Sequence, residues 1–82
     1  MRLADDIRDY VIQEWVEPAR KAGLRQVVVR AGDVHAAMGL AHRLPAVCAA
    51  LDAADFYDRA GVTLVTRSGP RQGSNAEWVL AL

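Results

Sequence analysis

The sequence predicts one α+β domain whose elements follow in the order helix, strand, helix, helix, strand, strand. Three observations predict it: helical apolar spacing near the N-terminus, a β-branched run at residues 27–29, and two strand-like segments around a turn-rich loop. A chain of 82 residues buries only about 60–65% of its unfolded surface, so its 52% hydrophobic residues must share one core. We therefore expect residues 1–82 to form a single domain.

The N-terminal segment has the periodicity of an amphipathic helix. Its inward stripe recurs every four residues at Leu3, Ile7, Val11, Trp15 and Ala19. Pro18 lacks a backbone N–H and crowds the preceding turn, so the helix is expected to bend or end near Glu17. The run 27–29 consists of three valines, which is typical of a short strand.

A second helix is expected directly after this strand. Asp33 follows Gly32 and is a plausible N-cap, and Gly39 is expected to stop the helix. The inward residues would be Val34, Ala37 and Met38. His35 is expected on the exposed side of this helix.

Pro45 suits the first position of a third helix, which is expected to run to about Ala60 and to end at Gly61. The expected inward residues of this helix are Val47, Ala50, Leu51 and Ala54, with Phe56 or Tyr57 at its end.

The last part of the chain predicts a hairpin. Residues 62–67 are rich in Val, Leu and Thr, residues 68–75 are polar and turn-rich, and residues 76–82 alternate. The alternating residues expected to face the helices are Ala76, Trp78, Leu80 and Leu82.

Charge is balanced in total, with 10 Lys+Arg against 10 Asp+Glu, but not in placement. Acidic residues dominate 1–17 and 52–60, whereas basic residues dominate 18–51, which weakly favours a polyanionic partner. The single Cys48 cannot form an internal disulfide, and no signal-peptide pattern or membrane-length apolar run is present. We expect a cytoplasmic protein that does not enter the membrane.

No constellation for catalysis is evident. Metal-capable Asp33, His35, His42 and Cys48 match no zinc spacing, and Cys48 is expected to be a small, partly buried hydrophobe rather than a nucleophile. The adjacent Asp5 and Asp6 diverge on a helix, and the 69–74 loop precedes a strand, unlike a nucleotide-binding loop. We therefore expect no enzyme activity, no cofactor and no metal.

Residues 33–51 resemble a helix-turn-helix, with small or apolar residues at the inner positions and glycine at the turn. The residues that carry the resemblance are Val34, Met38, Gly39, Leu40 and Val47. With the flanking helix, strand and hairpin, nearly the whole chain resembles a winged helix-turn-helix domain. Residues 31–35 and 43–48 are also similar to short stand-alone prokaryotic proteins, but that similarity suggests no activity.

The resemblance implies a small transcriptional or chromosome-associated regulator that binds double-stranded DNA. The third helix would enter the major groove, and the hairpin loop would touch the backbone or minor groove. The candidate contacts are Arg30, His42, Arg43, Ala46, Arg67, Arg71, Gln72, Ser74 and Asn75. A solvated turn at 42–43 and an ordinary mobile loop at 67–75 remain open alternatives.

Sequence-specific readout is not favoured. The outward side of the third helix carries Ala46, Ala49, Asp52 and Ala53, which offer base edges little beyond a contact to a thymine methyl. Binding would instead be weak and strongly salt-dependent.

The sequence also bears on three other kinds of partner: another protein, RNA and a second copy of the chain. The alanine-rich face at Ala46, Ala49 and Ala53 also suits a winged-helix protein–protein interaction module without nucleic-acid binding, since fold does not decide function. The aromatic residues are expected in the core, which disfavours RNA stacking. The wide apolar surface of residues 3–19 predicts a homodimer through the first helix.

Overall fold

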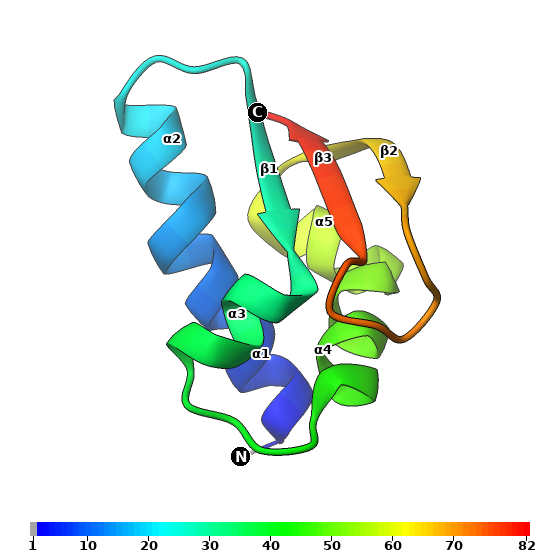
Figure 1. Cartoon of the computed structure of the whole chain (residues 1–82). Coiled ribbons are helices and arrows are strands. Elements are labelled where there is room, and N and C mark those ends of the chain that lie inside the picture. Colours follow the sequence, from blue (N-terminus) through cyan, green and yellow to red (C-terminus); the bar gives the residue numbers. More distant parts are fainter. Residues whose placement is uncertain (1) are drawn as a thin grey trace.

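The computed structural model describes residues 2–82 and has the predicted α+β class (Figure 1). The helical elements are α1 (Leu3–Val11), the π-helical turn η1 (Ile12–Val16), α2 (Glu17–Lys21), α3 (Ala31–Ala37), α4 (Leu44–Asp52) and α5 (Ala54–Ala60). The strands are β1 (Gln26–Arg30), β2 (Thr63–Ser68) and β3 (Glu77–Ala81). The short strand near residues 27–29 and the C-terminal hairpin are thus confirmed.

The three strands form one antiparallel sheet in the order β1-β3-β2. Val29 pairs with Trp78, and Leu64 pairs with Leu80, which sets one face toward the helices. Trp78 and Leu80 are completely buried, as their alternation predicted. On the other face, Val28 is exposed.

The core lies between this sheet and the helices. Figure 1 shows the helical segment from α1 to α2 along one side, with α4 and α5 on the other side below the sheet. The core includes fully buried residues from each of these parts, such as Ile7, Val47, Phe56 and Trp78. Burial of these large apolar side chains is the main stabilising contribution.

The first helical segment does not end at Pro18, in contrast to one expected outcome. Helical structure continues to Lys21 because η1 precedes the proline, and a wider π turn accommodates a residue that cannot donate a hydrogen bond. The π turn also shifts the inward face by one residue. Val16 is therefore completely buried, whereas the predicted inward Trp15 is half-buried.

The expected Asp33 N-cap of α3 is wrong. The helix begins at Ala31, and no side chain caps it. The backbone N–H groups of Ala31 and Gly32 donate instead to the carbonyls of Ala76 and Ser74, both at 2.9 Å. A segment distant in sequence satisfies these N–H groups, so Asp33 lies exposed in the first turn. The predicted stop at Gly39 is confirmed by its left-handed φ of 66°.

The expected continuous third helix is two helices, α4 and α5, separated at Ala53, where ψ is 137°. Arg8 supports the break, because its Nε donates to the carbonyl of Ala50 at 3.0 Å. The break turns Ala54 outward, contrary to prediction, and leaves Phe56 completely buried. No helix within residues 2–82 is both long and apolar enough to cross a membrane.

Candidate functional site

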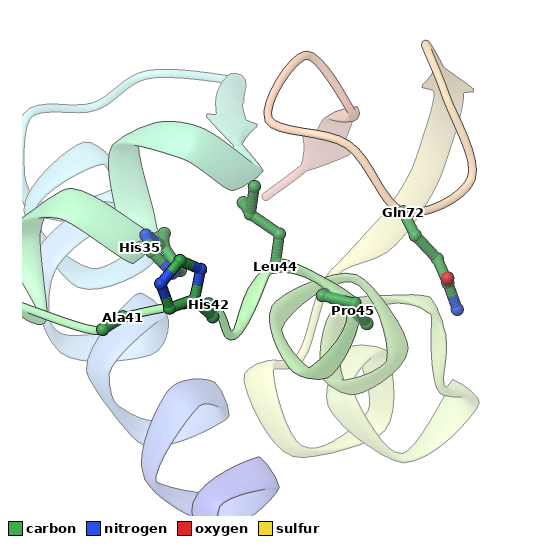
Figure 2. A pocket seen from close by; sticks show the side chains of 6 residues that line it. All are labelled: His35, Ala41, His42, Leu44, Pro45 and Gln72. Carbon is green, nitrogen blue, oxygen red and sulfur yellow. The ribbon is translucent and has the colours of Figure 1, made fainter.

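A pocket of about 560 Å³ lies where the α3–α4 connection (residues 38–43) meets the hairpin loop (residues 69–76). Its lining residues are His35, Ala41, His42, Leu44, Pro45 and Gln72. Figure 2 shows the two imidazoles on one side of the pocket, Gln72 on the other, and Leu44 and Pro45 between them. The pocket thus joins the start of α4 to the hairpin loop.

The α3–α4 connection is held by a hydrogen bond across it. The backbone N–H of Arg43 donates to Nε2 of His35 at 3.1 Å, and His35 is half-buried rather than exposed as expected. His42 has a φ of 55°, a left-handed conformation that side-chain-bearing residues seldom adopt. The connection therefore has a defined backbone that presents His42 and Arg43 at the start of α4.

The hairpin loop is fixed against two helices. The carbonyls of Ser74 and Ala76 accept the N–H groups at the start of α3. The buried thiol of Cys48 on α4 lies 3.8 Å from the carbonyl oxygen of Gly73. Because both contacts use backbone atoms of the loop, its side chains remain available, and Gln72 is exposed.

Arg67 organises the other end of this loop. Its Nε donates to Oδ1 of Asp52 at 2.8 Å, and its Nη2 donates to Oδ2 of Asp52 at 3.2 Å. The same guanidinium donates to the carbonyls of Ser68, Pro70 and Arg71 at 2.7–3.2 Å. Such a planar fork binds a carboxylate with two parallel hydrogen bonds.

Trp78 completes this arrangement. Its Nε1–H donates to Oδ1 of Asp52 at 2.9 Å, and the guanidinium of Arg67 lies 4.6 Å from the centre of the indole ring. We call Asp52, Arg67 and Trp78 the Asp52 network. It joins the end of α4 to both strands of the hairpin.

The surroundings of the Asp52 network shift three pKa values. The hydrogen bond to Asp52 raises the pKa of Arg67 above its ordinary value. Burial raises the pKa of the Cys48 thiol, and burial followed by the charge of Asp52 raises the pKa of Tyr57. Cys48 is thus more fully buried than the sequence predicted, and its raised pKa disfavours the nucleophilic thiolate.

Half of the basic side chains are neutralised within the molecule. Five of the ten pair with carboxylates, namely Arg8, Arg20, Arg30, Arg59 and Arg67. The other five form no ion pair within residues 2–82, namely Arg2, Lys21, Arg25, Arg43 and Arg71. Among the candidate contacts, Arg43 and Arg71 are therefore the exposed cations without a carboxylate partner in this part of the chain.

The structure brings some candidate contacts together and separates others. His42 and Gln72 line one pocket, and Arg43 and Arg71 adjoin them in sequence. Ala46 lies in the first turn of α4 and is half-buried, whereas Ser74 and Asn75 are exposed in the hairpin loop. Arg30 is held by Glu77 at 2.9 Å, and Arg67 belongs to the Asp52 network.

Sequence reasoning missed two contributors to the site. His35 was expected to be a solvent-exposed helix residue, yet it fixes the connection and lines the pocket. Asp52 was expected on the outward side of a helix that repels phosphate, yet it orders the hairpin through Arg67. Opposite charges 15 residues apart are too common to signal such a pair, and the contact of His35 uses a backbone N–H, which no residue type in the sequence marks.

The first helix has less free apolar surface than expected for the predicted homodimer. Ile7, Val11 and Val16 are completely buried in the core. Tyr10 and Trp15 are half-buried and pack on each other with ring centres 6.1 Å apart. The homodimer through residues 3–19 stays a prediction.

Comparisons of this chain with family models, with curated proteins and with solved structures find no match. Within residues 2–82, no three His, Cys, Asp or Glu side chains gather as metal ligands would.

Proposed function

We propose that this chain is a winged-helix protein that binds double-stranded DNA, as a small transcriptional or chromosome-associated regulator without enzymatic activity. The start of α4 and the hairpin loop would form the contact surface, with the loop in the position of the wing. The element order and the β1-β3-β2 sheet support this architecture.

One observation carries the proposal. The start of α4 and the hairpin loop line the same pocket, and each adds an exposed arginine without a carboxylate partner in residues 2–82, Arg43 and Arg71. Two cations on neighbouring segments suit the phosphates of one DNA backbone. Arg30 and Arg67 are disfavoured as DNA contacts, because their guanidinium groups already bind the carboxylates of Glu77 and Asp52.

The proposed interface is small, which agrees with the zero net charge of the chain. The exposed residue Ala49 on α4 cannot donate a hydrogen bond to a base edge. Phosphate contacts therefore supply most of the expected affinity, and the binding constant should fall steeply with salt.

The test is an anisotropy titration with a labelled DNA duplex at low salt. The wild-type chain should bind at micromolar concentrations, and Arg43→Glu combined with Arg71→Glu should weaken binding at least tenfold, with a shallower salt slope. The matched control is Lys21→Glu with Arg25→Glu, which changes the net charge equally.

The control residues Lys21 and Arg25 flank the turn between α2 and β1, which lies at the opposite end of the molecule from the α3–α4 connection (Figure 1). They are exposed and have no ion pair in residues 2–82. No binding by the wild-type chain at tens of micromolar, or an equal loss in both double variants, would contradict the proposal.

A second candidate is a winged-helix protein–protein interaction module. The observation that favours it is the alanine-rich side of α4, where Ala49 is exposed and Ala46 is half-buried. Purification from native cells separates the two functions. Stoichiometric protein that survives nuclease treatment supports the module, whereas recovery abolished by nuclease supports DNA binding.

A further inference from the structure

The pocket beside Pro45 has a larger volume than the edge of a base in a DNA groove would fill. Its volume of about 560 Å³ falls within the range of small-molecule sites, and it can hold a complete nucleobase. A base edge that remains stacked within a duplex would touch only its rim. The pocket is open to solvent, so its size allows a base that is turned out of the duplex to enter it.

The lining of the pocket suits a flat heterocycle. Ala41, Leu44 and Pro45 supply apolar surface, and an imidazole ring can stack on a base. Nε2 of His35 accepts the N–H of Arg43, so in the neutral ring the proton lies on Nδ1 and gives a hydrogen-bond donor. The exposed amide of Gln72 offers one acceptor and two donors.

The charges around the pocket suit a nucleotide strand. None of the six lining residues is acidic. Arg43 lies between the lining residues His42 and Leu44 in sequence, and Arg71 precedes Gln72. The two segments that line the pocket thus each carry an exposed arginine next to a lining residue, which suits the phosphates of a strand that passes over the pocket.

We propose that this pocket receives one unstacked nucleobase of a DNA strand whose flanking phosphates contact Arg43 and Arg71. The inference rests on the proposed DNA binding and specifies which form of DNA the site prefers. Taking a base out of a duplex costs free energy, and the cost is smallest where the base is already unpaired. The protein should therefore bind DNA with an unpaired base more tightly than a perfect duplex.

The experiment compares two labelled oligonucleotides of equal length, one a perfect duplex and the other a duplex with a single unpaired adenine. The expected result is at least tenfold tighter binding of the bulged duplex. Gln72→Ala should reduce this preference, and Ala41→Phe should abolish it by filling the pocket. Ala36→Phe is the matched control, since Ala36 is exposed on α3 outside the pocket lining.

Each outcome is decisive. Equal affinity for both oligonucleotides, or a preference that survives both pocket variants, overturns this inference and leaves DNA binding in place. No binding to either oligonucleotide overturns the proposed function. If circular dichroism shows that Ala41→Phe is unfolded, Gln72→Ala decides alone.

A last arm separates a strand from a free nucleotide. Deoxynucleoside monophosphates should displace the bulged duplex only at concentrations far above its Kd, because a mononucleotide lacks the second phosphate. Displacement at the same concentration would assign the pocket to a soluble nucleotide and would overturn the proposal for a strand.

Discussion

The hairpin lies near α4 both at the start and at the end of this helix, and these two regions differ in how their polar groups are used. At the end of α4, Asp52 accepts hydrogen bonds from Arg67 and from the indole N–H of Trp78, and Arg67 also donates to the carbonyls of Ser68, Pro70 and Arg71. At the start of α4, Arg43 and Arg71 have exposed guanidinium groups without an ion pair in residues 2–82. One end is saturated with internal partners, and the other presents its groups to solvent.

This difference shows why residue type alone does not define a contact. Arg67 and Arg71 are only four residues apart. The guanidinium of Arg67 is bound by groups within the protein, whereas the side chain of Arg71 is exposed and free to contact a partner. The two ends also depend on each other. Arg67 holds the carbonyl of Arg71, so the saturated end fixes the backbone that carries the free cation. A loop ordered beforehand loses less conformational entropy on binding.

Removing the carboxylate of the saturated end should have the largest effect. Asp52→Ala leaves the buried indole N–H of Trp78 without its acceptor and the guanidinium of Arg67 without its carboxylate, and we expect the free energy of unfolding to fall by about 2–3 kcal/mol. Urea denaturation measures this loss. Asp58→Ala is the control, since Asp58 is exposed and has no ion pair in the described part of the chain. An equal, small change in both variants would show that the Asp52 network does not stabilise the hairpin.

The next comparison tests how closely the hairpin loop is packed. Gly69 and Gly39 both have positive φ, at 83° and 66°, so alanine at either position carries similar backbone strain. A Cβ at Gly69 would collide with the backbone of Asn75, whereas a Cβ at Gly39 would meet nothing within 4 Å. Gly69→Ala should therefore cost at least about 1 kcal/mol more than Gly39→Ala in the same urea experiment. An equal loss of unfolding free energy in the two variants would mean that the loop backbone moves aside at little cost, which would contradict a loop fixed by its contacts.

The smallest effect is expected at the open end. Arg43→Ala and Arg71→Ala remove exposed side chains that have no ion pair in residues 2–82, so each should change the free energy of unfolding by less than about 0.5 kcal/mol. Thermal or urea unfolding of both variants measures this. A loss above about 1 kcal/mol in either variant would place that arginine in the structural framework instead of at a free surface.

Much of the fold could be predicted because it depends on local patterns. The alternation of Trp78 and Leu80 correctly predicted which side of β3 is buried, and the three consecutive valines marked β1. Gly39 and Gly61 correctly marked helix ends, and both have positive φ. These features follow from periodicity and backbone preference within a few residues.

Less of the candidate site could be predicted. The sequence marked the hairpin loop and the residues before Pro45 as DNA contacts only through the resemblance to a winged helix, and it did not indicate that they line one pocket. It named Arg30, Arg43, Arg67 and Arg71 all as candidate contacts, although two of them are held by carboxylates in the structure. Whether a cation is free depends on its neighbours in space, and these neighbours lie 15 and 47 residues away.

By itself, the sequence determined the α+β class, the order of helices and strands, and most of the buried positions, because apolar spacing and turn residues act locally. The tertiary structure alone decided the break between α4 and α5, the capping of α3 by loop carbonyls, and the division of the arginines into bound and free. Each of these depends on a polar group from a distant segment. Arg8 binds a carbonyl of α4, loop carbonyls accept the N–H groups of α3, and carboxylates pair with the bound arginines. Such pairings arise only when the packed core brings the segments together.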